Sequence, residues 1–202
     1  RQPTFNELYW VPGGNPLLKP ERGYSADGTV LFRGKIKNWN WTAEGSVFSR
    51  IISNWILWLP GANGQASPVN VQEVLSRGTE TKWLLSKNTN KSTLSFQIHS
   101  SYVLSTVRSS SIVDDASVGK QLIYTPRYSG NASIHYRFRL IFVEWMQQYA
   151  GYRFTSSDNA AWLMPYTIAT VRLGVEASQK FPLQLTAQCA NVFNQEYAIV
   201  NA

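Results

Sequence analysis

The sequence predicts an all-β protein, an antiparallel up-and-down transmembrane β-barrel, with about eight of its strands in this chain of 202 residues. Apolar and polar residues alternate with a period of about two, which is typical of strands with two unlike faces. Short polar turns alternate with long loops, and only 15% of the residues are charged whereas aromatic residues are abundant. Because hydrocarbon offers the backbone no hydrogen-bonding partner, a spanning sheet must pair every strand and close on itself.

The expected strands follow one another as eight long arms. Their ranges are 21–34, 39–57, 70–86, 92–108, 120–136, 139–156, 163–179 and 182–200. Short turns are expected at 35–38, 87–91, 136–139 and 179–182, and long loops at 60–69, 109–120 and 156–162. An arm of about eighteen residues spans about 60 Å, whereas crossing the bilayer takes only about 9–11 residues. The surplus should therefore project beyond the lipid on the side of the long loops.

The alternation assigns each side chain to one of two faces. In the arm 92–108, Leu94, Phe96 and Ile98 fall on one face, and Gln97 and His99 fall on the other. The apolar face should meet lipid, where an Arg or Lys at mid-depth costs about 2–4 kcal/mol. The charged residues on the strands are therefore expected to face a water-filled lumen; they are Glu44, Arg50, Glu80, Lys82, Arg172 and Glu176.

Aromatic residues gather near the expected short turns. Trp39 and Trp41 follow the first turn, Trp83 precedes the second, and Phe181 lies in the fourth. Trp and other aromatic residues are enriched at the boundary between lipid and water. We interpret these four residues as part of an aromatic girdle; the alternative is that they are ordinary aromatic residues of a sheet.

Little in the sequence points to catalysis, to a metal site or to nucleic-acid binding. His99 and His135 lie apart from any cluster of Cys or carboxylate residues, and the pair Asp114-Asp115 lies in a Ser-rich loop. The sequence has no nucleophile, phosphate-loop or dinucleotide motif. The net charge of +7 comes from scattered Lys and Arg residues, and Cys189 is the one cysteine. We therefore expect a protein that is not an enzyme, has no cofactor and does not bind nucleic acid.

Four segments resemble, in the same order, the late barrel region of TonB-dependent outer-membrane receptors of the cobalamin- and siderophore-receptor-like branch. The most specific segment is PTFNELYWVPGGNPLLKPE at 3–21, which in that family ends an extracellular loop and leads into a barrel strand. The others are RGTE at 77–80, LIYTPRYSGNASIHYRF at 122–138 and NVFNQEYAIV at 191–200. Together they extend over nearly the whole chain.

The resemblance implies a barrel of about 22 strands around an N-terminal plug, in the outer membrane of a Gram-negative bacterium. Residues 1–202 would be the C-terminal part of the barrel, without the plug, its TonB-contacting box and the closing strand. The implied function is active uptake of a scarce ligand, such as a metal chelate, cobalamin or a glycan. The implied partners are the protein's own plug domain, the TonB complex, outer-membrane lipid and that ligand. The six charged strand residues would hold the plug or line the path that opens when it shifts.

The opening stretch, residues 1–20, would be the extracellular loop that leads into the first strand. We expect neither helix nor strand there, because its prolines remove backbone donors and Gly13-Gly14 permits turns that other residues resist. It would form a folded cover at the mouth of the barrel. Aromatic residues in or near the long loops are the candidates for ligand contact, and they are Tyr9, Trp10, Trp58 and Trp162. For Tyr9 and Trp10 we favour packing on the barrel rim, and ligand contact is the alternative.

Two other functions fit part of the pattern. A passive barrel, either a porin or an autotransporter translocator, would share the alternation but would leave the ordered receptor-like segments unexplained. A soluble β-rich carbohydrate-binding module would suit the 8 Trp residues. Such a module would be soluble and monomeric without detergent.

Overall fold

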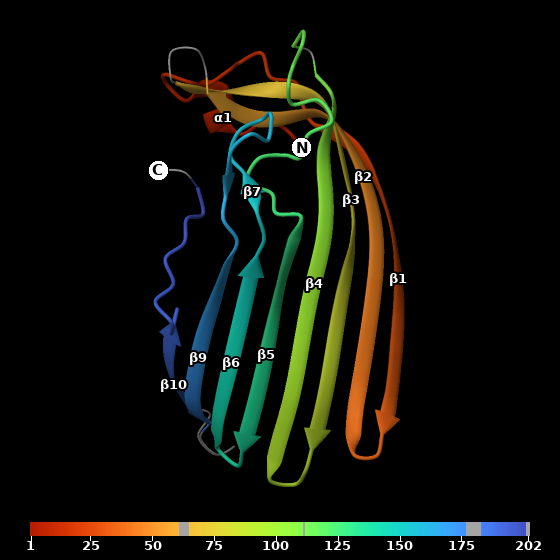
Figure 1. The fold of residues 1–202 in the computed structure, drawn as a ribbon, viewed down its shortest axis with the longest axis vertical. Helices are drawn as coiled ribbons and strands as arrows, with labels where there is room; N and C mark the ends of the chain where they lie inside the picture. Colours follow the sequence, from red (N-terminus) through yellow and green to blue (C-terminus); the bar gives the residue numbers. More distant parts are fainter. Residues whose placement is uncertain (61–64, 111, 177–182, 201–202) are drawn as a thin grey trace.

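Eight long strands form one antiparallel sheet in the computed structural model, which describes residues 1–60, 65–110, 112–176 and 183–200 (Figure 1). The strand order is β1-β2-β3-β4-β5-β6-β9-β10. These strands are β1 Arg22–Ile36, β2 Trp39–Pro60, β3 Ala66–Asn88, β4 Ser92–Ser109, β5 Tyr128–Phe138, β6 Ile141–Ala150, β9 Tyr166–Glu176 and β10 Gln184–Ala190. A separate hairpin of β7 Arg153–Phe154 and β8 Trp162–Leu163 and the helix α1 Phe5–Tyr9 complete the elements.

Short and long connections lie at opposite ends of the sheet, as the sequence predicts. The turns at 37–38, 89–91 and 139–140 lie at the lower end in Figure 1, which we call the turn end. Residues 112–127 and 151–165 and the helix α1 lie at the other end, which we call the loop end. Lys37 and Arg139 adopt positive φ angles of 54° and 53° in two of the tight turns. The expected turn at 179–182, with Phe181, lies outside the described residues.

Several of the predicted arm boundaries are wrong. The arms expected at 120–136, 139–156 and 182–200 are shorter strands, because 120–127, 151–156 and 191–200 leave the main sheet. Gln121 is buried and Leu122 packs on the apolar cluster at the loop end, so this part of the chain is held by loop contacts instead. The loop expected at 60–69 is shorter than predicted, since β3 begins at Ala66. The opening stretch also contains the helix α1, which the prediction did not include.

The strand register gives the sheet two unlike faces. Residues paired across antiparallel strands point to the same side, so the row Trp83, Ile98 and Ala132 belongs to one face. The adjacent row, Lys82, His99 and Asn131, belongs to the other. We call these the apolar face and the polar face. The predicted alternation along the arm 92–108 is therefore confirmed.

The buried core of the described residues is small and lies at the loop end. Val74, Val107 and Leu122 form it, with Trp55 and Leu57 packed against them. Elsewhere on the apolar face many large side chains stay exposed, for example Trp83 at 55% and Ile98 at 52% of their surface. No second layer covers the apolar face in the part of the chain that the structure describes. Such a sheet needs a hydrophobic medium on that face, as a membrane barrel has.

Three of the four predicted girdle residues, Trp39, Trp41 and Trp83, lie in the described part of the chain, on the apolar face near the turn end. Trp39 pairs with Ile36, and Trp41 pairs with Gly34 and Leu85. The ring of Trp39 also lies 6.1 Å from the ring of Phe96. Among the described residues, no helix has both the length and the apolar character needed to cross a bilayer.

Candidate functional site

The N-terminal segment 1–21 folds as a cap at the loop end, held by one arginine between two carboxylates. The guanidinium of Arg1 lies 3.0 Å from Glu7 Oε1 and 2.8 Å from Glu21 Oε2. Glu7 also closes a capping box with Thr4 at the start of α1, which pairs backbone donors that a helix start would otherwise leave free. Glu21 is 9% exposed and accepts a hydrogen bond from the backbone N–H of Ile56.

Both carboxylates are held in the charged form. Hydrogen bonds from Arg1 lower the pKa of Glu21 from its ordinary value, against the effect of burial, and the Ile56 N–H lowers it further. Burial alone would raise the pKa of Glu7, but hydrogen bonds from Thr4 and Arg1 outweigh burial and lower it. The attachment of the cap therefore depends on charge.

Two asparagines fasten the cap to the extensions of β2 and β3 beyond the rest of the sheet. Asn15 Nδ2 donates to the carbonyl of Pro68 over 3.1 Å. Asn70 accepts from the N–H of Lys19 over 2.9 Å and donates to the Lys19 carbonyl over 3.1 Å. Asn70 also donates to the carbonyl of Asn54. The cap is thus docked on the hairpin of β2 and β3.

Two of the predicted ligand-contacting aromatic residues meet at this cap. Trp10 and Trp58 pack edge to face, with ring centroids 5.7 Å apart, a contact of the kind that rim packing would make. Half of the surface of Trp10 stays exposed. Tyr9 is exposed and packs on Phe5 at 5.1 Å. These rings present a partly exposed aromatic surface at the loop end.

The fourth predicted aromatic residue, Trp162, lies on the hairpin of β7 and β8, away from the cap, and lines a cavity there. That cavity includes Tyr128 and Tyr149, which project from the apolar face of the sheet. No ring contact joins Trp162 to Trp10 or Trp58 in the described part of the chain. The structure therefore does not gather the four predicted residues into one site.

A buried glutamine that sequence reasoning missed joins two of the long connections. Gln121 is 1% exposed, and its side chain accepts from the N–H of Ser105 and donates to the carbonyls of Val103 and Thr125. Its backbone N–H and C=O pair with the side-chain amide of Asn159 at 2.9 Å each. Residues 112–127 and 151–165 are therefore linked to each other and to β4.

The six charged residues predicted for the lumen all lie on the polar face, and several are paired. Glu44 lies 3.5 Å from Lys82, and Glu176 lies 3.1 Å from Arg137. Arg172 pairs with Glu144. The other two predicted residues are Glu80, which pairs in register with Ser46 and Ser101, and Arg50, whose guanidinium lies 5.7 Å from the Phe48 ring centroid.

The partners Glu144 and Arg137 were missed by the site prediction. The alternation pattern could have predicted Glu144, because this residue interrupts an apolar run and falls on the polar face of its strand. Charges paired across strands in this way form a hydrophilic wall that can contact water or another polar domain. The wall could therefore face either solvent or a polar partner.

The described residues bring together no cluster of side chains that could hold a metal ion. No group of three or more His, Cys, Asp and Glu side chains comes together within ranges 1–60, 65–110, 112–176 and 183–200. His135 stacks on Phe142 at 5.5 Å, and both lie on the polar face. Asp115 accepts from the N–H of Ser117 within its own turn.

Comparison with known proteins identifies the family of this chain. The family model described as TonB dependent receptor-like, beta-barrel, matches residues 1–194, so the chain belongs to that family. TonB-dependent receptors are outer-membrane transport proteins of Gram-negative bacteria and are not enzymes. The predicted family, fold class, membrane location and absence of enzymatic activity are therefore confirmed.

The curated relatives are longer than this chain. The vitamin B12 transporter BtuB of Photobacterium profundum is 24% identical over 201 residues, which cover 98% of this chain and 30% of that protein. BtuB of Vibrio vulnificus is 33% identical over 86 residues, or 42% of this chain and 13% of that protein. This chain thus spans less than a third of the length of either relative.

Solved structures share the fold at low identity. The copper transporter OprC aligns with a TM-score of 0.68 and 15% identity, covering 98% of this chain and 30% of OprC. The ferric yersiniabactin uptake receptor FyuA from Yersinia pestis aligns with a TM-score of 0.61 and 15% identity, covering 88% of this chain and 26% of FyuA. These likenesses concern the fold alone.

Proposed function

We propose that this chain is part of the barrel wall of an outer-membrane receptor that takes up a scarce ligand with energy supplied through TonB. The observation that carries the proposal is the two-faced sheet. Its apolar face is exposed along the strands, and its polar face carries three cross-strand ion pairs, Glu44–Lys82, Glu144–Arg172 and Arg137–Glu176. One face suits acyl chains, and the other suits a hydrated plug domain.

In this proposal residues 1–202 form the C-terminal part of the barrel, and the plug belongs to another part of the longer protein. The loop end faces the cell exterior, and residues 1–20 cover the mouth of the barrel. Arg50, Glu80 and the paired charges on the polar face contact the plug or line the path beside it. Support comes from the family match and from the shared face of these residues.

The ligand proposed first is a corrinoid. Two curated relatives carry the name vitamin B12 transporter, whereas the structural neighbours transport copper or ferric yersiniabactin and share only the fold. The exposed rings of Tyr9 and Trp10 offer flat apolar faces at the loop end, and Trp58 packs against Trp10. Such faces suit a corrin, an aromatic chelate or a sugar, so the ligand must be chosen by measurement.

The test uses the full-length protein in a Gram-negative strain that lacks its own cobalamin receptor. Uptake of labelled cobalamin should appear on expression and should vanish when TonB is deleted. Energy-independent uptake would contradict the proposal and would favour a passive barrel. TonB-dependent uptake of a ferric chelate but not of cobalamin would support the proposed receptor function. It would contradict the proposal that the ligand is a corrinoid.

The aromatic contact is tested with matched variants of the cap. Trp10→Ala should raise the dissociation constant of cobalamin about tenfold, the loss expected when one large aromatic contact is removed. Leu17→Ala is the control, because Leu17 is an exposed apolar residue of the same cap at 87% exposure. Equal affinities for both variants and the wild type would remove Trp10 from the ligand site.

A further inference from the structure

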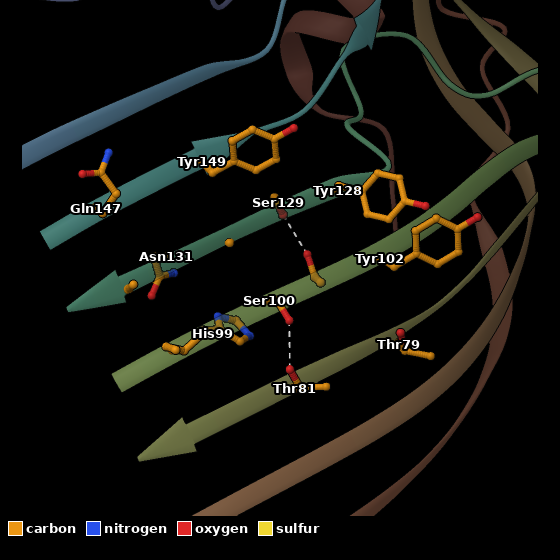
Figure 2. A pocket seen from close by; sticks show the side chains of 14 residues that line it. Thr79, Thr81, His99, Ser100, Tyr102, Tyr128, Ser129, Asn131, Gln147 and Tyr149 are labelled. Atoms are coloured by element: carbon orange, nitrogen blue, oxygen red, sulfur yellow. Dashed lines mark hydrogen bonds between the residues drawn. The ribbon is translucent and has the colours of Figure 1, made fainter. Parts of the chain in front are cut away.

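The apolar face of the sheet contains a hollow of about 490 Å³ next to the loop end, with a mostly apolar surface to which several side chains add hydroxyl groups. Two successive rows of paired residues on this face form the hollow. One row is Thr81, Ser100, Gly130 and Tyr149, and the next is Thr79, Tyr102 and Tyr128. Gly130 has no side chain, so the floor of the hollow is low there. Figure 2 shows the three tyrosines side by side at one end of the hollow.

These polar groups are on the face that otherwise carries apolar side chains. Thr81 and Ser100 hydrogen-bond to each other over 2.9 Å. Tyr102 and Tyr128 pack with ring centroids 4.8 Å apart. Toward the turn end the same face continues with Ile98 and then with Phe96, Ile134 and Trp145. The hollow therefore lies where an apolar surface gives way to hydroxyl groups.

A second cavity of about 410 Å³ continues the hollow toward the loop end, because Tyr128 and Tyr149 line both. It adds Arg127, Tyr152, Phe154 and Trp162. The guanidinium of Arg127 lies 5.8 Å from the centroid of the Phe154 ring. No carboxylate pairs with Arg127 among the described residues. We call the two cavities together the outer groove.

Along the outer groove the chemistry changes in a fixed order. A free cation with aromatic rings comes first, hydroxyl groups follow, and apolar side chains come last. A lipid in the outer leaflet presents the same order, from phosphate and sugar through ester or amide links to acyl chains. The groove extends over strands β3 to β6, which at about 4.8 Å per strand is about 14 Å wide. This width suits a disaccharide headgroup with several acyl chains better than a two-chain phospholipid.

We propose that the outer groove binds a phosphorylated, acylated glycolipid of the outer leaflet. Arg127 contacts its phosphate, the rings of Trp162 and Tyr152 contact its sugars, and Thr81 and Ser100 contact its amide or ester links. Interfacial aromatic rings and cations are suited to this depth. The inference rests on the proposed function only in that the loop end faces the cell exterior. It assigns Trp162 to lipid contact rather than to ligand capture.

The test is native mass spectrometry of the full-length, delipidated receptor in detergent, with diphosphoryl hexa-acylated lipid A as the probe. The wild type should retain one lipid A, which phosphatidylglycerol and inorganic phosphate should not displace at equal concentration. Arg127→Gln should weaken retention about tenfold, the loss of one charge-assisted contact. Trp162→Ala and the double variant Thr81→Val, Ser100→Ala should each weaken it severalfold.

The matched control is Arg139→Gln, since Arg139 lies over the Phe138 ring at 5.4 Å but at the turn end. This variant should retain lipid A as the wild type does. Retention unchanged in Arg127→Gln and Trp162→Ala, equal loss in Arg139→Gln, or full displacement by phosphatidylglycerol would each overturn the proposal. Cobalamin uptake, measured on the same variants, reports the proposed function separately, because lipid retention does not depend on transport.

Discussion

Glu21 is the residue on which the cap depends most directly. It binds Arg1 through two hydrogen bonds and accepts the N–H of Ile56. Glu21→Gln would remove the charge and leave that arginine and that N–H poorly matched. We expect local opening of residues 5–21 to become easier by about 1–3 kcal/mol, measured as faster amide hydrogen exchange in the full-length receptor.

Glu196→Gln is the control for this change, because Glu196 is exposed and lies on the C-terminal segment away from the cap contacts. Exchange in residues 5–21 should be the same in this variant as in the wild type. Unchanged exchange in Glu21→Gln would show that the asparagine contacts alone hold the cap.

The same carboxylates make the cap sensitive to acid. The pKa values of Glu7 and Glu21 are lowered in the folded state, so their stabilisation is fully present above the unfolded value of about 4.3. It is lost as the pH falls through the lowered folded values. Protection of residues 5–21 should therefore be constant between about pH 7 and pH 5 and should decline below about pH 4. A decline beginning near pH 6 would point to another group.

At the residue scale, the sequence was sufficient to place charges on a face but not to find buried polar groups. The placement of Glu44 and Lys82 on the polar face follows from alternation alone, because a period of two fixes the side on which each residue projects. The burial of Gln121 and Glu21 cannot be predicted in this way, since it depends on residues distant in sequence, namely Ser105 and Arg1. A glutamine between Lys120 and Leu122 carries no local sign of three backbone contacts.

At the element scale, strand β4 offers a direct test of the two faces. Ile98 lies on the apolar face and Gln97 on the polar face. Ile98→Arg should destabilise the full-length receptor in bilayers by about 2–4 kcal/mol, because the cation would face hydrocarbon. Gln97→Arg should change the free energy of unfolding by much less. Equilibrium unfolding in denaturant checks both, and equal effects would contradict the assigned faces.

The lengths of the elements were harder to predict than their number. Alternation and turn residues located β1 to β4 within a few residues, because those strands pair along most of their length. The fifth arm begins later than predicted, and the sixth and eighth arms end earlier, because other contacts replace sheet pairing there. Asn191, for example, has a φ of 51° and bonds to Gln195 directly after β10. Such a hydrogen-bonded turn ends the strand before the predicted end of the arm.

At the scale of the whole molecule, the sheet that the described residues form has β1 at one edge and β10 at the other, and neither edge is paired within those residues. A barrel closes such edges, whereas an open sheet offers them to other chains. We expect residues 1–202 expressed alone to aggregate in detergent, and the full-length receptor to stay monodisperse, by size-exclusion chromatography with light scattering. A monomeric, folded fragment would mean that the edges are protected in another way.

The central claim is that one face of this sheet contacts lipid and the other faces an aqueous interior. The most direct measurement is spin-label accessibility along β4, with single labels at residues 94–99 of the cysteine-free, full-length receptor in bilayers. Labels at Leu94, Phe96 and Ile98 should be accessible to oxygen and protected from a water-soluble nickel chelate. Labels at Ser95, Gln97 and His99 should show the reverse. Uniform accessibility along these six positions, or the opposite phase, would contradict the account.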